Sequence, residues 1–397
     1  MSTFIYPTLE TTVAPLAWRQ VDLCAVAANV SALVAHCAPA ELMVVVKADA
    51  YSHGSVEVAR IALAAGARRL GVATLAEGLE LRQAGITAPV LAWLAGPHSP
   101  YKTAIRHDLE LAAYSCMQLE SIAQAAREAK RRAVVHLKAE TGMWRGGASD
   151  EWTSLVTRAC ELETTGDIEV VGIWSHLARA DEPDDLSTDA QRDAFEHAVD
   201  TARVHGLRPR MRHLANSAAT LTRADLHYEM VRCGLAVYGV NPLSDRPSPV
   251  PLKPAMTVRA TVVHVKNAPT GVGVSYGHTY RTETATRLAL LPLGYADGLP
   301  VLPAPHPPPF GHRGVALQLA GRVCMDQTVA DIGTHPIDVG DTVVVLGPGD
   351  DGEWTAEDWA HGSGRSAYDI LTGLGRRRMG LKYVDNPNRY SGYAERQ

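Results

Sequence analysis

The chain has 397 residues, of which 46% are hydrophobic and 20% are charged, as in an ordinary globular protein. Its formal net charge of -5 at pH 7 gives no overall electrostatic reason to bind nucleic acid or an anionic membrane surface. Because a single hydrophobic core stops growing at roughly 250 to 300 residues, we expect two domains and a function in small-molecule chemistry.

The N-terminus and the cysteines indicate the compartment. The segment "MSTFIYPTLE" lacks the basic and apolar regions of a secretory signal, and no later apolar stretch approaches about 20 residues. The six cysteines are scattered, without a CxxC pair or a zinc-site spacing, which is typical of reduced thiols. We therefore expect a cytoplasmic protein with no membrane segment and no metal site.

From about residue 20 to residue 240, short apolar runs alternate with helical periods that end in glycine or basic residues. The predicted strands are Leu42–Val46, Leu70–Ala73, Val90–Leu94, Leu109–Ala113, Val134–Lys138, Val170–Trp174, Met211–Leu214 and Tyr228–Arg232. Strands that alternate with helices in this way favour a closed, TIM-like (β/α)8 barrel over residues 1–245. A doubly wound open sheet is the alternative.

The chain changes character after residue 240. The segment "NPLSDRPSPVPLKP", residues 241–254, is rich in proline and serine and is typical of a linker. Beyond it, "TVRATVVHVKNA", "RLALLPLGYA", "VALQLAGRV", "TVADIG" and "DTVVVLG" predict short strands with few helical periods. We therefore expect a second, mainly β domain over residues 246–397, in which "PVLPAPHPPPFGH" forms an irregular loop.

Polar and charged residues stand where several predicted barrel strands end. Lys47 directly follows the first apolar strand, and the later strand ends carry Lys138, followed by Arg145, then His176, Asn216 with Ser217, and Arg232. Each residue could have an ordinary structural role. Lys47 could be a solvated loop residue, Asn216 could cap a helix, and His176 could be a hydrogen-bonded histidine of the core. Together they lie at the barrel end where active sites form. A desolvated lysine can form a Schiff base, which suggests an aldehyde cofactor.

The stretch "VVVKADAYSHG", residues 44–54, resembles the pyridoxal-phosphate attachment motif of bacterial alanine racemases. "KAETGMWRGG", "WSHLARADE", "HLANSAA", "VRCGLAVYG", "GVSYGHTY", "LGYADG", "GRVCMDQ" and "SAYDIL" are similar to the family's remaining motifs and follow in the family's order. The resemblance spans nearly the whole chain. It implies an N-terminal (β/α)8 barrel, a C-terminal β domain, a small amino-acid substrate and a head-to-tail homodimer with shared active sites.

The resemblance also implies roles for individual residues. Lys47 would attach pyridoxal phosphate, Arg232 would face its pyridine nitrogen, and Tyr276 of the partner chain would be the second base. The other cofactor-binding residues would be Tyr51, His176, Asn216, Ser217, Gly234, Leu235 and Tyr368. Arg145 and Met325 would hold the substrate carboxylate. Supporting residues would be Tyr295, Asp326 and Lys138, and a lysine at the position of Lys138 is often carbamylated in this family.

The residue types agree with racemisation. A proton must leave one face of Cα and return on the other, which calls for two acid/base groups such as Lys47 and Tyr276. An aspartate at the ring nitrogen would make the ring a strong electron sink. Arg232 cannot accept a proton and so limits delocalisation of the carbanion.

Some positions depart from the family's pattern. Ser52 stands where the family usually has glycine, and the pair Gly146-Gly147 stands where a leucine-glycine pair is common. Trp144, a bulky residue, adjoins the substrate arginine. Val301, with Leu299 and Pro300, replaces an arginine common in the entry corridor, and "GRRRMG" near the end replaces a Pro-Arg pair. These changes are either drift or a site reshaped for another amino acid. The sequence also leaves open a decarboxylase or aldolase, and a protein that binds pyridoxal phosphate without catalysis.

Overall fold

The structure is a computed structural model that describes residues 14–182, 184–243, 246–303, 307–375 and 379–385. It divides the chain into two compact units. The barrel unit is built on residues 21–256 and also takes in residues 366–372. Among the described residues, the β unit is built on 257–303 and 307–365, together with 14–20, 373–375 and 379–382.

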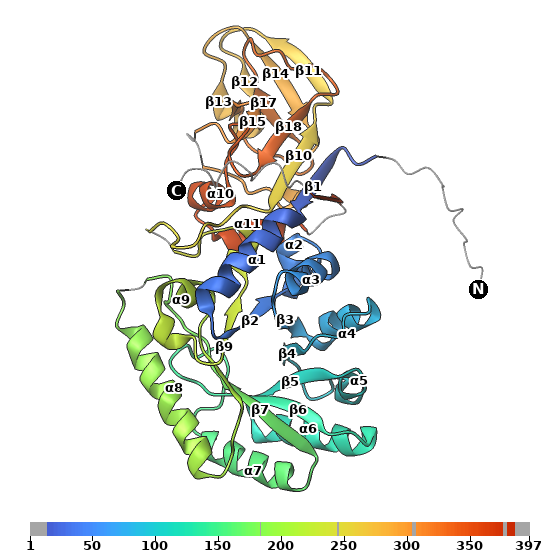
Figure 1. Cartoon of the computed structure of the whole chain (residues 1–397). Coiled ribbons are helices and arrows are strands. Elements are labelled where there is room, and N and C mark those ends of the chain that lie inside the picture. Colours follow the sequence, from blue (N-terminus) through green and yellow to red (C-terminus); the bar gives the residue numbers. More distant parts are fainter. Residues whose placement is uncertain (1–13, 183, 244–245, 304–306, 376–378, 386–397) are drawn as a thin grey trace, which may run out of the picture. The chain divides into compact units, whose positions relative to one another are not determined.

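The barrel unit contains an eight-stranded parallel sheet in the order β8-β7-β6-β5-β4-β3-β2-β9 (Figure 1). Its strands are β2 (Glu41–Val45), β3 (Arg69–Thr74), β4 (Val90–Leu94), β5 (Leu109–Ala113), β6 (Ala133–Lys138), β7 (Ile168–Trp174), β8 (Met211–His213) and β9 (Met230–Cys233). The amide of Arg232 donates to Ala215 O at 3.0 Å, which joins β9 to the chain just after β8. The predicted barrel is confirmed and the alternative of a doubly wound sheet is wrong, because successive strands pair in chain order.

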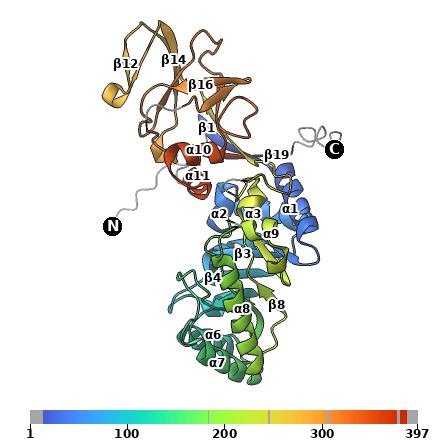
Figure 2. The same cartoon turned by 90° about the vertical axis from the view of Figure 1, so that its left-hand side faces the viewer.

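The predicted strands agree with the observed ones to within two residues, because apolar runs bounded by glycine and charge mark them clearly. The helices lie around the strands (Figure 2). They are α1 (Leu23–Cys37), α2 (Lys47–Ser52), α3 (Ser55–Ala64), α4 (Leu75–Gln83), α5 (Tyr101–Arg106), α6 (Cys116–Ala129), α7 (Trp152–Thr164), α8 (Ser187–Val204) and α9 (Ser217–Thr222), with the 3-10 turns η1 (Ala224–Leu226) and η2 (Leu235–Tyr238).

The β unit has a sheet in the order β11-β14-β17-β16-β15-β18-β10-β1-β19 and a small ribbon of β12 and β13. The strands are β1 (Ala17–Asp22), β10 (Met256–Thr261), β11 (His264–Ala268), β12 (Gly273–Val274), β13 (Tyr280–Arg281), β14 (Thr286–Leu291), β15 (Phe310–His312), β16 (Val315–Leu319), β17 (Thr328–Asp331), β18 (Thr342–Leu346) and β19 (Gly380–Val384). The remaining elements are η3 (Tyr276–His278), η4 (Tyr295–Asp297), α10 (Ala356–Ser363) and α11 (Ala367–Gly373), of which α11 belongs mainly to the barrel unit. This confirms a separate, mainly β domain.

Within the ranges that the structure describes, no helix is long and apolar enough to cross a membrane. Across the same ranges, no group of three or more His, Cys, Asp or Glu side chains is arranged to hold a metal ion.

Candidate active site

The carboxyl ends of the barrel strands bring together residues that are far apart in the sequence. Lys47 follows β2, Lys138 ends β6, His176 follows β7 and Arg232 lies on β9. The basic groups in this region are close enough to influence one another, because the charge of Arg145 lowers the pKa values of Lys47, Lys138, His176 and Arg232. An excess of positive charge suits a ligand that carries phosphate and carboxylate groups.

Lys47 is half-buried, and its amine lies 5.9 Å from the centre of the Trp93 ring. Burial lowers the pKa of Lys47 below its usual value, and the charge of Arg145 lowers it further, while Glu77 opposes the shift. A lysine in this environment gives up its proton more readily than a solvated one. Lys47 is therefore not an ordinary solvated loop residue, which was the structural alternative for this lysine.

The backbone after Lys47 forms a left-handed turn. Ala48 to Ser52 all have positive φ angles, between 51° and 66°, a region that non-glycine residues rarely adopt. Glu77 stabilises the start of the turn, because its carboxylate accepts from the amide of Ala48 at 2.7 Å. Ser52 therefore occupies a left-handed position where the usual glycine would be unstrained.

The left-handed turn directs Tyr51 toward the segment after β9. A Cβ at Gly234 would lie 2.3 Å from Tyr51 Oη, so only glycine leaves room for this hydroxyl. Ser217 Oγ accepts from the amide of Gly234 at 2.9 Å, and the ring of Tyr368 lies 5.8 Å from that of Tyr51. Three hydroxyl-bearing side chains and a helix start thus border one small region, a cradle that suits a phosphate.

Asn216 and Leu235 border this cradle without presenting a free polar side chain. Asn216 is the N-cap of α9, and its Oδ1 accepts from the amide of Ala219 at 3.1 Å. Leu235 is buried at the start of η2. The side chain of Asn216 therefore serves the fold, as in the ordinary alternative for this residue.

Arg232 is buried and makes most of its hydrogen bonds to the barrel itself. Its Nη1 donates to His213 O at 2.7 Å and to His213 Nδ1 at 3.1 Å. Its Nη2 donates to Ser175 O at 2.7 Å and is 3.2 Å from both Leu214 O and His176 Nδ1. These acceptors account for the hydrogens on both terminal nitrogens, so only the Nε–H of Arg232 remains for a ligand.

His176 is held in one protonation state. Burial, together with the charges of Arg232 and Arg145, keeps its pKa well below the usual value, so the ring is neutral. Since an arginine only donates, Nδ1 of His176 accepts and its single proton is on Nε2. His176 therefore offers an Nε2–H donor.

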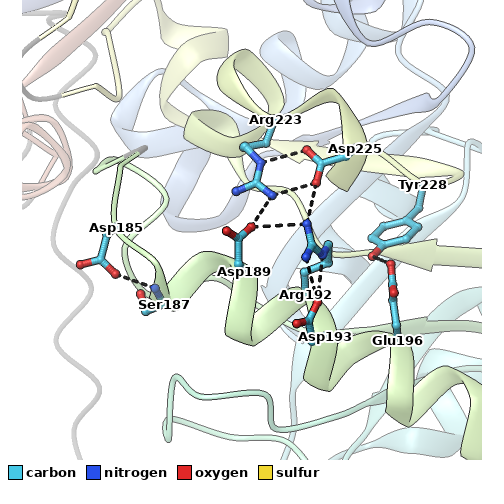
Figure 3. Close-up of polar contacts among 9 residues, drawn as sticks. All are labelled: Asp185, Ser187, Asp189, Arg192, Asp193, Glu196, Arg223, Asp225 and Tyr228. Atoms are coloured by element: carbon cyan, nitrogen blue, oxygen red, sulfur yellow. Dashed lines mark hydrogen bonds and ion pairs between the residues drawn. The ribbon is translucent and has the colours of Figure 1, made fainter.

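Helix α8 positions His176 and contacts the segment after α9. Gln191 Nε2 donates to His176 O at 3.0 Å, and Gln191 Oε1 accepts from the amide of Ala178 at 2.9 Å. Residues of α8 also join the segment after α9 in a network of ion pairs (Figure 3). In it, Asp189 accepts from Arg223 Nη2 at 2.7 Å, and Arg192 lies 3.4 Å from Asp225.

Lys138 and Trp174 lie side by side near Arg145. The amine of Lys138 is 4.9 Å from the centre of the Trp174 ring. Burial, then the charges of Arg145 and Arg232, lower the pKa of Lys138 to about 8. Trp174 Nε1 is buried and has no hydrogen-bond partner among the residues that the structure describes. A Cβ at Gly146 would lie 3.7 Å from Lys138 Nζ, so the missing side chain uncovers this amine.

The other predicted site residues belong to the β unit. Tyr276 begins η3 and is 72% exposed, and Met325 is 53% exposed. Their loops meet within the unit, because Ser275 Oγ lies 3.3 Å from Cys324 Sγ. Tyr295, at the start of η4, is also exposed, and its amide donates to Cys324 O at 3.0 Å. These loops present large side chains at the surface of the β unit.

Two of the departures from the family's pattern are on exposed side chains, whereas Ser52, Leu299 and Pro300 are buried. Trp144 is 79% exposed and Val301 is 46% exposed. Gly147 is required, because a Cβ there would lie 2.7 Å from the backbone of Ala139. The three arginines of "GRRRMG", residues 376–378, lie outside the described residues.

Several residues that shape the site were missed by the sequence reasoning. Glu77 and Gln191 lie within helices, and Glu110 and His136 lie within strands, where a single polar residue carries no motif. His213 ends β8 and begins "HLANSAA", in which only Asn216 and Ser217 carry a predicted role. Successive side chains of a strand point to opposite faces of the sheet. This alternation could have indicated that Glu110 and His136 lie on the same face of the sheet as Lys138.

The chain is similar to a known family of enzymes along most of its length. The family "Alanine racemase, N-terminal domain" matches residues 21–242, and "Alanine racemase, C-terminal domain" matches residues 255–381. The alanine racemase of Salinispora arenicola is 49% identical over 92% of this chain and 97% of its own, and that of Thermobifida fusca is 46% identical over 90% and 96%. The crystal structure of alanine racemase from D-cycloserine producing Streptomyces lavendulae aligns with a TM-score of 0.90 at 44% identity, over 94% of this chain and 98% of that one.

Proposed function

The chain belongs to the alanine racemase family, and we propose that it interconverts L- and D-alanine with pyridoxal phosphate held at the carboxyl end of its barrel. One observation carries this proposal. A half-buried lysine with a lowered pKa, a hydroxyl-lined cradle and a buried arginine converge in one region of the barrel. The similarity favours alanine over another amino acid, and racemisation over decarboxylation, aldol cleavage or mere cofactor binding.

The residues at this end of the barrel fit pyridoxal phosphate. The hydroxyls of Tyr51, Ser217 and Tyr368 and the start of α9 would hold the phosphate, and Lys47 would bind the aldehyde carbon. When bound, the cofactor withdraws electrons and so weakens the Cα–H bond of the amino acid. The Nε–H of Arg232 would donate to the ring nitrogen, which keeps that nitrogen unprotonated.

Lys47 and Tyr276 of the partner subunit would hold and return the proton on opposite faces of Cα. The lowered pKa of Lys47 favours an amine that accepts a proton at Nζ. His176 offers its Nε2–H as a donor, and we infer that it donates to the hydroxyl oxygen of the partner's Tyr276 and so orients it. The exposed loop of Tyr276 is compatible with insertion into a second copy of the chain.

Arg145, aided by the backbone N–H of Met325 from the partner subunit, would bind the substrate carboxylate. The amine of Lys138 lies close to the arginine loop, and a second cation there would compete for the same anion. Carbamylation, in which the neutral amine adds CO2 and releases a proton, would replace this cation by an anion that orients Arg145. It would also supply an acceptor near Trp174, whose Nε1 has no partner among the described residues.

The test of the function is incubation with single enantiomers of a panel of amino acids in heavy water. We expect inversion of alanine together with deuterium at Cα, at a higher kcat/KM than for any other amino acid of the panel. Release of CO2 or cleavage products would indicate another reaction, and absence of both inversion and exchange would contradict the proposal.

A Ser217→Ala variant tests the phosphate cradle. Loss of one hydrogen bond to a charged group, worth about 1.5 to 3 kcal/mol, should weaken binding of pyridoxal phosphate by about 10-fold or more. The measurement is a fluorescence titration of cofactor-free protein. Ser121→Ala is the matched control, because Ser121 is half-buried on α6 and its hydroxyl donates to the carbonyl of Met117, away from the cradle. Equal affinities of the two variants would contradict the assignment of Ser217.

The carbamylation of Lys138 is tested by its dependence on pH and CO2. A pKa of about 8 makes roughly half of the Lys138 amines neutral at pH 8, against well under 1% for an ordinary lysine. We therefore expect the carbamate signal in ¹³C NMR with labelled bicarbonate to grow as pH rises from about 7 to about 9. The signal should be absent from Lys138→Ala, and its persistence there would rule out this lysine.

A Val301→Arg variant tests whether the departure at this position affects substrate capture. A restored cation should attract the carboxylate of alanine and lower KM, whereas kcat should change little because the proton transfers are untouched. The control of opposite charge is Val301→Glu, which should raise KM. Unchanged KM values in both variants would indicate that the departure is drift.

A further inference from the structure

A chain of buried hydrogen bonds runs from Arg232 into the interior of the barrel and has no part in the chemistry described above. His213 Nδ1 lies 3.1 Å from Arg232 Nη1, and His213 Nε2 lies 3.0 Å from His136 Nδ1. His136 Nε2 in turn lies 3.0 Å from Glu110 Oε2. Both imidazole rings are fully buried.

The first link fixes the tautomer of His213. Arg232 only donates, so Nδ1 of His213 accepts. Burial and the charge of Arg232 keep the pKa of His213 well below its usual value, so the ring is neutral and carries one proton. That proton is therefore on Nε2 of His213.

The second and third links then follow. Because His213 Nε2 donates, His136 Nδ1 accepts, and His136 cannot be a doubly protonated cation. Its proton is on Nε2 and is donated to Glu110. Burial raises the pKa of Glu110, but the hydrogen bond from His136 and the charge and hydrogen bond of Arg69 lower it below its usual value, so this carboxylate is ionised and only accepts. All three bonds thus point from Arg232 toward Glu110, and such aligned bonds strengthen one another.

The surroundings leave little freedom for either ring. A Cβ at Gly172 would lie 2.2 Å from His136 Nδ1, so a glycine at this point of β7 makes room for the imidazole. Trp174 stacks on His213 with the two planes 4° apart and the ring centres at 5.7 Å. The far end of the chain is anchored by Arg69, whose Nη1 lies 2.7 Å from Glu110 Oε1.

We propose that His136 and Glu110 are positioning residues for the racemase reaction, which act through His213 to hold Arg232 with its Nε–H toward the cofactor ring. If His136 were absent, the Nε2–H of His213 would lose its acceptor and the ring could adopt the other tautomer. The Nδ1–H of His213 would then point at the Nη1–H of Arg232. Two donors cannot form a hydrogen bond, so the guanidinium of Arg232 would have to move away from His213. This inference rests on the proposed function, because that function gives Arg232 its role.

Two substitutions of His136 separate the links. His136→Asn retains an oxygen near the position of Nδ1 that can accept from His213, but it loses the donor to Glu110. His136→Leu loses both links. The matched control is Glu229→Gln. The carboxylate of Glu229, just before β9, accepts from Nε of Arg212 on β8 at 2.9 Å and is not bonded to His213, His136 or Glu110.

The kinetic measurements are kcat and KM for alanine and the wavelength of the visible band of the bound cofactor. We expect His136→Leu to lower kcat by about 10- to 100-fold, since a misplaced group that supports the chemistry costs this much. We expect KM to stay within about 3-fold and the visible band to shift, because the partner of the ring nitrogen has moved. His136→Asn should lie between the parent and His136→Leu, and the control should match the parent. Parental kcat and an unshifted band in His136→Leu would overturn the inference.

The tautomers are tested on the cofactor-free parent protein by ¹⁵N NMR of its histidines, with the spectra of His136→Asn and His213→Asn as assignments. We expect both rings to be neutral and protonated on Nε2. A proton on Nδ1 of either ring, or a charged ring, would overturn the inference even if His136→Leu failed to fold. If instead the parent neither binds pyridoxal phosphate nor racemises alanine, the proposed function fails while the NMR result still decides the hydrogen-bond chain.

Discussion

A Lys47→Ala variant is expected to lose at least about 10³-fold of the racemisation rate, because it lacks both the amine that binds the cofactor and the base on one face of Cα. The partial burial and lowered pKa of Lys47 suit both tasks. The variant should retain its fold, since the side chain lies at a strand end and not in the apolar core. The measurements are racemisation of alanine and the visible absorbance of the purified protein.

The matched control is Lys130→Ala, because Lys130 caps α6 on the surface of the barrel unit. Borohydride treatment followed by peptide mapping should leave the cofactor on the peptide that contains Lys47 in the parent and in the control. Labelling of Lys138 in place of Lys47 would show that the wrong lysine has been assigned.

A Tyr276→Phe variant should lose a similar factor of about 10³ in racemisation, because only the hydroxyl that carries the proton on the second face is removed. Cofactor binding should be unaffected, since Tyr276 lies in the β unit and the cradle lies in the barrel unit. The variant should therefore be coloured but nearly inactive, and a stopped assay with each enantiomer of alanine measures the loss.

Tyr228→Phe is the control for this variant. Its hydroxyl donates to Glu196 on α8 at 3.2 Å (Figure 3), and Tyr228 precedes β9, at the amino end of that strand and not at its carboxyl end. A Tyr276→Phe enzyme as active as Tyr228→Phe would mean that another group acts as the second base.

Much of the barrel could be predicted from the sequence because its strands are short apolar runs that end in a charged or polar residue. The run Leu42–Val46 followed by Lys47 is an example, and the same rule found His176 and Arg232. Parallel barrel strands gather their carboxyl ends, so strand ends that are far apart in sequence predict one site. The family resemblance added the roles of Tyr51 and Tyr276, which strand periodicity does not supply.

Other features depend on tertiary contacts that no local pattern encodes. Strand β1 lies between β10 and β19, which are distant in sequence, so its partners were not predictable. The left-handed turn at Ala48–Ser52 contains no glycine and so carries no turn signal. His136 and Glu110 each occupy a strand interior, and their partnership depends on which barrel strands are neighbours.

The central claim is that Lys47 of one subunit and Tyr276 of another form one site, and mixing the two inactive variants tests it most directly. In a two-fold dimer, a heterodimer of Lys47→Ala and Tyr276→Phe has one site with both defects and one site with neither. Random exchange of equal amounts makes about half the dimers mixed, so about a quarter of parental activity should return. Exchange itself is verified by copurification of differently tagged subunits. If exchange occurs and no activity returns, the shared site is contradicted.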